Sequence, residues 1–557
     1  MIIIEEWKRA YPSDDPNKKE IADLLGIAAS DVISFEIIKR SIDARKKPDL
    51  FFVYNIAACI GRESDFLKRI KKNKKLFGKV KPYTPVSYVL PESGNELLKN
   101  RPVIVGFGPA GMFCSYLLAK QGYRPIVLER GRKVEDRTED IKKYWKTGIL
   151  DTESNVSFGE GGAGTFSDGK LATTVKDPSG RCKEVMKIFT LFGADPEIIY
   201  DAAPHIGTDK LCGIVKNMRE EIKTLGGSVL FESRFDSVIE ENGHLTGIRY
   251  LDKEGNEKTI PCEILVLAPG HSARDTFYRI RGQGFVLEPK SFAVGFRAEH
   301  RQEDINLGRY GKTGIKGEEI PGAASYKLTA QTANGRSVFS FCMCPGGYVV
   351  DASSEEGMIA VNGMSYSGRD SENANSAIIV SVTPDDFPGK GSDPLSGIEF
   401  QRDLERKAYY AGKGKVPIQR LTDFYRSVIG EEYPVSPSEE RAEIRPVHKG
   451  RFEWSDLSGI LPDECNRSMI EAFSVFGRKI KGFDDGDVIL SGVESRTSSP
   501  VRIVRGADLE SNIKGVYPCG EGAGYAGGIT SAAMDGLRVA EAVIGRYAPF
   551  DKTDENA

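Results

Sequence analysis

The stretch VIVGFGPAG, residues 103–111, decides the fold, because it joins an apolar run to a glycine-rich turn. The apolar run predicts a short buried strand, and the residues after the turn predict a helix to about Gly122. In such a strand–turn–helix unit, Gly106 permits the tight turn and Gly108 lets the backbone approach a pyrophosphate. Gly111 lets the helix and the strand pack closely.

The predicted helix starts at Pro109 and Ala110, where unpaired N–H groups and the positive end of the helix dipole favour an anion. A second apolar strand follows and ends at Glu129, 18 residues beyond Gly111. A carboxylate at this place accepts hydrogen bonds from both hydroxyls of a ribose and repels a 2′-phosphate. The segment therefore predicts a site for NAD or FAD, and not for NADP.

Residues 228–268, which follow this segment in the chain, predict a β-meander. Its strands are expected near 229–240, 245–251 and 264–268, with turn residues between them. The meander closes at an Ala-Pro-Gly sequence that ends in Gly270.

Near the C-terminus, residues 515–524 (GVYPCGEGAG) precede a glycine turn and an apolar helix that opens at Gly528. The N–H groups at Gly528 and Ile529 are placed to stabilise negative charge on a reduced flavin ring. A plain helix start, capped by Thr530 or Ser531, fits the same residues.

Together these segments resemble the glutathione-reductase-like FAD flavoproteins. Within them, the chain resembles the largely uncharacterised bacterial FAD-dependent dehydrogenases related to the aminoacetone-oxidase-like and geranylgeranyl-reductase-like groups. The resemblance spans most of residues 101–546, and the segment before it resembles a module that some members carry. The first glycines with Glu129 match the ADP-binding fingerprint, and residues 268–270 (APG) resemble the family's Ala-Thr-Gly strand end. Gly520 and Glu521 stand where the family has Gly-Asp or Gly-Glu.

This resemblance implies FAD as the cofactor, with Glu521 holding a ribityl hydroxyl. It also implies that Arg130 and Arg137 flank the pyrophosphate, and a surface position is the alternative for either arginine. Pro269 departs from the family's threonine and removes a hydroxyl and a backbone N–H, whereas Gly270 still allows a close approach.

A second glycine-rich stretch, residues 158–170 (FGEGGAGTFSDGK), is not expected to be another nucleotide fold. No long strand precedes it, and no strand ending in an acid follows it. We expect Gly161, Gly162 and Thr165 to bring backbone donors to the flavin side of the pyrophosphate or to the ring. An ordinary surface loop is the alternative.

The substrate domain is expected in residues 290–500, the least patterned part of the chain. Cys342 and Cys344 share one face if their segment is extended, and a redox or nucleophilic role is considered for Cys344 against an inert buried thiol. Glu494 and Arg496 can clamp a carboxylate or phosphate, or form a structural turn. His271, a further candidate catalyst, directly follows the Ala-Pro-Gly sequence.

The N-terminal part predicts a small α+β module of the ferredoxin-like type. Strands are expected near 32–40 and 50–57, and helices near 18–25 and 63–74. Residues 68–81 contain eight basic side chains and no acidic one, which favours a solvated surface and is compatible with docking to phosphate.

Composition excludes several classes of protein. The 557 residues carry 77 basic and 80 acidic side chains, and no apolar run of about 18 residues predicts a membrane span. The acidic start of the chain differs from a secretory signal, so the cytoplasm is the expected location. Nine scattered cysteines favour reduced thiols, and five histidines without a Cys-x-x-Cys motif give little support for a metal site.

These observations predict an α/β fold, in which a Rossmann-like FAD-binding domain carries an inserted α+β substrate domain and a ferredoxin-like module. The expected function is FAD-dependent oxidation or reduction of a small molecule by hydride transfer at flavin N5, with electrons from the substrate or a transient donor such as NAD(P)H. Alternatives are an RNA-modifying or non-redox flavoenzyme with a basic docking module, although nucleic acid is not the favoured partner, and a flavin-bearing sensor. The expected parts are residues 1–97, 98–289, 290–500, 501–548 and a tail at 549–557.

Overall fold

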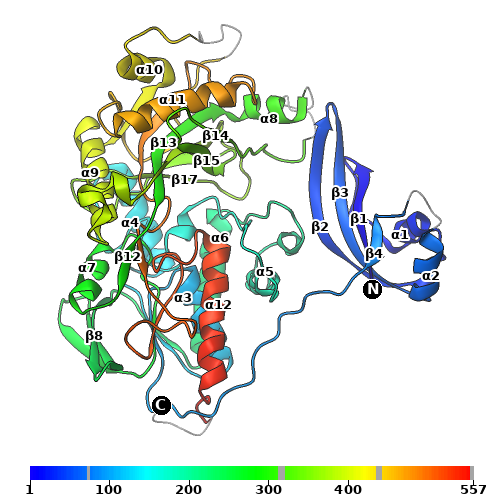
Figure 1. Cartoon of the computed structure of the whole chain (residues 1–557), viewed down its shortest axis with the longest axis horizontal. Helices are drawn as coiled ribbons and strands as arrows, with labels where there is room; N and C mark the ends of the chain where they lie inside the picture. The colour runs from blue at the N-terminus through cyan, green and yellow to red at the C-terminus, as the bar shows by residue number, and fades with distance from the viewer. Residues whose placement is uncertain (72–75, 312–319, 435–441, 552–557) are drawn as a thin grey trace.

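The computed structural model describes residues 1–71, 76–311, 320–434 and 442–551, which form a small N-terminal module beside a larger body (Figure 1). Three lysines of the expected basic stretch, at positions 72, 74 and 75, and most of the expected tail lie outside these ranges. No helix within the described ranges is long and apolar enough to cross a membrane.

The N-terminal module has the ferredoxin-like topology that the sequence predicts. Its four strands form an antiparallel sheet in the order β2-β3-β1-β4, with α1 and α2 as the two crossovers. Helix α1 begins where the Asn17 side chain accepts from two backbone N–H groups, and it ends at Gly26 in the left-handed conformation. The elements are β1 (Ile2–Ala10), α1 (Lys18–Leu25), β2 (Val32–Lys46), β3 (Asp49–Ile60), α2 (Glu63–Ile70) and β4 (Val80–Pro82).

The body is built around a five-stranded parallel sheet in the order β24-β11-β5-β6-β7. Alternate strand residues point to opposite faces, so Ile104 and Val127 pack under helices while Leu128 and Leu265 face the other layer. The strands are β5 (Val103–Val105), β6 (Ile126–Leu128), β7 (Ser228–Leu230), β11 (Leu265–Leu267) and β24 (Val516–Pro518). The helices of this domain are α3 (Pro109–Lys120), α4 (Val134–Thr147), α5 (Arg181–Leu191), α6 (Thr208–Thr224) and α12 (Ile529–Arg546).

The second face of this sheet is covered by the meander and helix α7 (Arg274–Gly282). The meander differs from the prediction, because its outer segments belong to the parallel sheet as β7 and β11. Glu232, with φ at 53°, interrupts the expected long first strand and separates β7 from β8. The meander itself consists of β8 (Arg234–Glu241), β9 (His244–Leu251) and β10 (Glu257–Pro261), the last of which the sequence did not predict.

A cap domain is inserted where β12 (Leu287–Pro289) pairs with β23 (Val501–Ile503). Its seven-stranded sheet has the order β14-β15-β18-β13-β22-β19-β21, and apolar side chains of one face pack with helices α9, α10 and α11. The sheet consists of β13 (Phe292–Arg301), β14 (Thr329–Gln331), β15 (Ser337–Cys344), β18 (Asn373–Val382), β19 (Val416–Arg420), β21 (Phe452–Trp454) and β22 (Ile489–Glu494). The remaining elements are α8 (Gln302–Tyr310), β16 (Tyr348–Asp351), β17 (Val361–Met364), α9 (Ser396–Ala411), α10 (Leu421–Ile429), β20 (His448–Lys449) and α11 (Asp463–Gly477).

The N-terminal module contacts the body through its long β2–β3 hairpin, which stands beside α8 in Figure 1. Arg40 of β2 donates to Asp201 at 2.9 Å and also pairs with Glu197. Near the tip of the hairpin, Ala44 and Leu50 share an apolar cluster with cap residues. Because both contacts are made by one hairpin, the module is fixed to the nucleotide-binding domain and to the cap at once.

Candidate functional site

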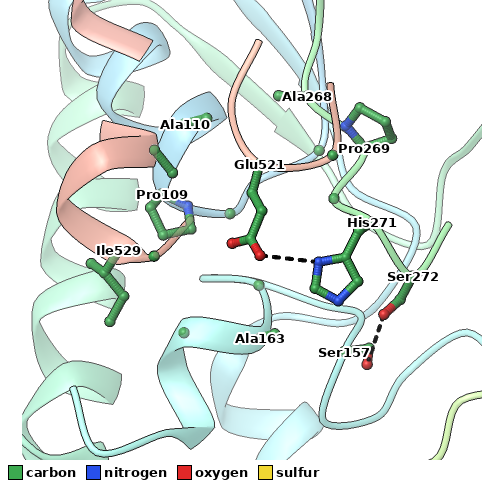
Figure 2. A pocket seen from close by; sticks show the side chains of 18 of the residues that line it. Pro109, Ala110, Ser157, Ala163, Ala268, Pro269, His271, Ser272, Glu521 and Ile529 are labelled. Carbon is green, nitrogen blue, oxygen red and sulfur yellow. Dashed lines mark hydrogen bonds and ion pairs between the residues drawn. The ribbon is translucent and has the colours of Figure 1, made fainter. Parts of the chain in front are cut away.

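A cavity of about 540 Å³ lies at the carboxyl ends of the parallel strands, between the Rossmann-like domain and the cap. Residues that follow β5, β6, β11 and β24 line one part of it, and cap residues line the other. Ligands of open parallel α/β sheets bind at this edge, where helix N-termini and loops converge. Figure 2 shows the part near Glu521, with Pro109 and Ile529 on one side and His271 on the other.

The glycine turn after β5 is possible only with glycine at two of its positions. Gly106 has φ at +92°, and a Cβ there would lie 2.2 Å from the carbonyl oxygen of Ala268. A Cβ on Gly111 would lie 1.9 Å from the carbonyl oxygen of Gly106. Strand, turn and helix therefore pack closely, and Gly108 lies in the cavity wall. The fingerprint needs a glycine there so that the backbone can approach a pyrophosphate.

Two helices present their N-termini to the cavity. Helix α3 starts after Gly108 and α12 starts after Gly528, and neither cap residue makes a side-chain capping bond. The hydroxyl of Thr530 instead donates to Leu171 O, and that of Ser531 accepts from Gly527 N–H. The free first-turn N–H groups and the dipoles of both helices favour negative charge at two places in the cavity.

Glu129 is held at the cavity wall by three backbone N–H groups. One carboxylate oxygen accepts from Phe107 at 2.8 Å, and the other accepts from Gly131 at 2.9 Å and Gly159 at 3.0 Å. A carboxylate offers about four acceptor positions, so this geometry leaves one for a ligand hydroxyl. The side chain is thus fixed in place by the loops that shape the cavity.

Glu521 and His271 form a polar pair inside the cavity. Nδ1 of His271 lies 3.2 Å from a carboxylate oxygen of Glu521, as Figure 2 shows. Gly520, which precedes the carboxylate, packs against Ala110, and its N–H donates to Asp535 at 2.8 Å. These contacts position Glu521 between the starts of α3 and α12 and the loop after β11.

The two arginines expected at the pyrophosphate differ in position. Arg130 lines the cavity, but its guanidinium pairs with Glu153 and Asp275, both at 2.9 Å. The structure places Arg137 behind the cavity wall, where its fully buried guanidinium donates to carbonyl oxygens of residues 155, 156, 159 and 160. Because all of its nitrogens point to these carbonyls, Arg137 holds the second glycine-rich loop in shape instead of facing the cavity.

That loop contributes backbone to the cavity. Gly162 lines the wall opposite Gly108, and a Cβ on Gly162 would lie 3.0 Å from Gly108 Cα. Gly161 and Thr165 lie one layer behind, since a Cβ on Gly161 would meet the Thr165 hydroxyl at 2.0 Å. The loop therefore closes the cavity with its backbone, without forming a second nucleotide fold.

The cap closes the far end of the cavity with charged side chains that are already paired. A carboxylate oxygen of Glu494 accepts a hydrogen bond from Nε of the buried Arg297 at 3.0 Å. Burial nevertheless raises the pKa of the Glu494 carboxyl, although the charge of Arg297 acts in the opposite direction. Arg496 lines the cavity and donates to both oxygens of the buried Glu405. The expected clamp thus consists of an acid and a base that each have a partner, with the Asn362 side chain beside them.

The two thiols of β15 are not equivalent. The sequence favoured Cys344, but Cys342 is the one that lines the cavity, and Cys344 is fully buried. A β-bulge between Phe341 and Cys344 breaks the alternation of side chains on which the prediction depended. A bulge leaves no residue signature here, so the sequence could not have identified Cys342.

Most of the predicted site residues therefore meet at one cavity. Residues that line it are Gly106, Gly108, Pro109, Ala110, Glu129, Arg130, Gly162, Gly270, Glu494, Arg496, Glu521, Gly528 and Ile529. Residues that lie behind its walls are Gly111, Arg137, Gly161, Thr165, Cys344 and Gly520. Lys170, the last residue of the second glycine-rich stretch, and Asn362, which belongs to no motif, line the cavity as well and were not predicted.

This donor set fits FAD on the observations above. The start of α3 suits a pyrophosphate, Glu129 suits a ribose, and the start of α12 suits the electron-rich edge of a reduced flavin. Glu521 lies between them, where a polyol chain needs an acceptor.

The fold and the site define a Rossmann-type flavoprotein, and comparison with known proteins agrees. Residues 291–497 match the family described as "FAD-dependent protein, C-terminal domain-like", and residues 10–59 match a domain of unknown function. An "uncharacterized protein" of Clostridium beijerinckii is 46% identical over 540 residues, which cover 96% of this chain and 97% of that protein. The chain belongs to the family of this clostridial protein, and its cofactor is FAD.

Two solved structures show similarity to most of this chain at low sequence identity. A triple mutant of a flavin-dependent brominase is 12% identical, with 80% of both chains covered and a TM-score of 0.36. A geranylgeranyl bacteriochlorophyll reductase-like protein of Thermoplasma acidophilum is also 12% identical, with 80% of this chain and 78% of that chain covered and a TM-score of 0.33.

Proposed function

We propose that the protein is an FAD-dependent oxidoreductase that acts on a small molecule bound against the cap. One observation carries the proposal, namely that a single cavity is lined by the dinucleotide fingerprint at one end and by cap side chains at the other. When bound, FAD supplies hydride transfer at its N5 atom. A substrate bound at the cap end would lie in the same cavity as the cofactor.

The residues of this chain bind and orient the reactants. Glu129 and the start of α3 hold the adenosine and pyrophosphate part, while the start of α12 favours negative charge on the reduced ring. The cap end combines the Phe341 ring with paired charges at Glu494 and Arg496, which suits a small substrate with both apolar and polar groups. His271, held by Glu521, is the group placed to hold or move a proton within the cavity.

An anaerobic titration of the yellow protein with NADH, and separately with NADPH, tests this proposal. Rapid loss of the flavin absorption that returns in air would support a reductase with a transient nicotinamide donor. Without bleaching by either nucleotide, the same assay is run with candidate small-molecule donors, and a donor that bleaches the flavin would support a substrate-reduced dehydrogenase. A flavin that no donor or acceptor reduces or reoxidises would contradict an oxidoreductase.

A further inference from the structure

Two thiols lie at the cap end of the cavity, on a distorted stretch of β15. The pairing of β15 with β18 runs to Phe341, opposite Ala377, and resumes at Cys344, opposite Asn375, so β15 holds one extra residue. Within this bulge Cys342 has φ at 43°, a conformation that residues other than glycine rarely adopt. Bulges beside active sites redirect side chains, and this one turns Cys342 into the cavity.

Cys344 lies directly behind Cys342. Its Sγ donates to the carbonyl oxygen of Cys342 at 3.2 Å. Because the Cys344 sulfur already contacts the main chain of Cys342, the two thiols are near neighbours, and an S–S bond needs their Cβ atoms only about 4 Å apart. One thiol therefore faces the cavity, and its partner lies within reach behind it.

Two cations from different parts of the chain surround this pair. Arg297 of β13, fully buried, donates to the Cys342 carbonyl oxygen at 3.1 Å and lies 3.9 Å from the Cys344 sulfur. Lys170, from the loop of the Rossmann-like domain, donates to the carbonyl oxygen of Met343. The thiol segment is thus held by positive charge on both sides of the domain boundary.

The resulting electrostatics differ between the two sulfurs. The hydrogen bond from Cys344, together with the two cations, lowers the pKa of Cys342 to about 6, although burial and the nearby Glu494 act in the opposite direction. The pKa of Cys344 is raised by that same hydrogen bond, by burial and by the charge of Asp168. Of the two thiols, Cys342 is therefore the one whose surroundings favour the thiolate.

We propose that Cys342 and Cys344 form a peroxide-reactive thiol pair, a redox-modification site at the substrate end of the cavity. The Cys342 thiolate attacks one oxygen of hydrogen peroxide, so that an S–O bond forms and the O–O bond breaks, and the departing hydroxide takes a proton to become water. The Cys344 sulfur then displaces hydroxide from the sulfenic acid, which gives the disulfide and a second water after the Cys344 proton is transferred. Both electrons that reduce the peroxide come from the two thiols.

The position of the pair gives this chemistry a role beyond the proposed function. A thiolate with solvent access beside a resolving thiol is the arrangement that redox-sensing cysteines use. A local source of the peroxide rests on the proposed function, since a reduced flavin that reacted with oxygen would release hydrogen peroxide beside this pair. Disulfide formation removes the sulfur anion and draws Cys342 toward Cys344, which changes the end of the cavity that the substrate must occupy.

Peptide mapping of the reduced holoprotein after treatment with one equivalent of hydrogen peroxide tests the proposal. We expect the unreduced peptide that contains Cys342 and Cys344 to lose two hydrogen atoms. The Cys344→Ser variant should instead retain a sulfenic acid at Cys342 that dimedone labels, whereas Cys342→Ser should give neither product. Cys182→Ser is the matched control, because this half-buried thiol lies outside the pair and burial raises its pKa.

Alkylation of the wild-type protein with iodoacetamide provides a second measurement that needs no variant. At pH 7 we expect Cys342 to react at least about tenfold faster than Cys182, because only the thiolate is nucleophilic. Replacement Lys170→Met should move the pH midpoint of the Cys342 reaction upward. Equal reactivity of the two thiols, or peroxide oxidation without a Cys342–Cys344 disulfide in the wild type, would overturn the proposal, whatever the flavin titration shows.

Discussion

At the scale of single residues, Glu129 shows how a loop can fix a binding group before the ligand arrives. Its carboxylate accepts from three backbone N–H groups, and two of the donors belong to separate glycine-rich turns. The side chain therefore connects the first fingerprint to the second glycine-rich loop. Loss of its charge should weaken the binding of FAD and loosen both turns.

The replacement Glu129→Gln should lower FAD affinity at least tenfold, which corresponds to about 1.4 kcal/mol. The amide keeps one acceptor oxygen, but its NH₂ group would face a backbone N–H donor. Fluorescence titration of the apoprotein with FAD measures the change. Glu139→Gln, an exposed position on α4, is the control and should bind as the wild type does; equal affinity of both variants would contradict this role of Glu129.

The same scale shows what the sequence could and could not predict about the site. The turn glycines and Glu129 follow from backbone geometry, since a Cβ at Gly106 or Gly111 would overlap the backbone. The direction of the Arg137 guanidinium does not follow from any motif, because it depends on a loop that folds back from residues 155–160. Residue type thus predicts sites formed by backbone better than sites formed by long side chains.

At the scale of elements, a buried ion cluster joins helix α7 of the Rossmann-like domain to helix α9 of the cap. Glu405 of α9 is fully buried between Arg274, at 2.7 Å, and Arg496, at 2.7 Å. These guanidinium groups hold the pKa of the Glu405 carboxyl well below its usual range, although burial alone would raise it. The cluster therefore stabilises the contact between the two domains whenever this carboxyl is ionised.

The replacement Glu405→Gln should lower the free energy of unfolding by about 3–5 kcal/mol at pH 7, because it leaves buried guanidinium groups without their counter-charge. The folded-state pKa lies below the unfolded value, near 4.3, so this stabilisation is present above about pH 4.3 and is lost as pH falls below it. Urea unfolding at pH 7, 4 and 3 should show that the difference in the free energy of unfolding between variant and wild type becomes smaller as the pH falls. Glu399→Gln, a more exposed position on the same helix, is the control; a gap that stays constant with pH would refute the assignment.

Elements also show where sequence patterns are sufficient. The bounds of α1 agree with the prediction because an asparagine cap and a glycine end mark them in the sequence. The expected long first strand of the meander is two strands, because Glu232 takes a left-handed conformation that its residue type does not indicate. Helix ends that a capping residue or a glycine marks can therefore be predicted from residue type. Interruptions of a strand at other residues depend on tertiary packing.

At the scale of the whole molecule, the N-terminal module is attached to the body through the hairpin formed by β2 and β3. Arg40 exchanges backbone hydrogen bonds with residues 200 and 202 and pairs with Asp201. The tip packs on the apolar cluster that includes Met343, the residue between the two thiols. The cavity lining, in contrast, is drawn from Val105 onward in the described chain.

Deletion of residues 1–97 should leave FAD bound, with a flavin-to-protein ratio within about twofold of the full chain, because the cavity walls lie in the body. The deletion should increase the binding of a hydrophobic dye, since it uncovers the cluster around Met343. Absorption spectroscopy and dye fluorescence measure the two effects. Arg40→Ala in the full chain should leave both signals near the wild type, and loss of flavin after the deletion would show that the module supports the cofactor site.

The parallel sheet takes its edge strand, β24, from the last part of the chain, although β5 and β6 are made long before it. During translation, the ferredoxin-like module and the cap can both emerge from the ribosome before the strand that completes this sheet exists. Helix α12, which packs against α3 and closes the cavity, comes later still. Newly made chains can therefore complete their flavin site only after β24 and α12 have been synthesised, and a chain that stops short at residue 500 would present an open, unfinished nucleotide fold to the cell's proteases.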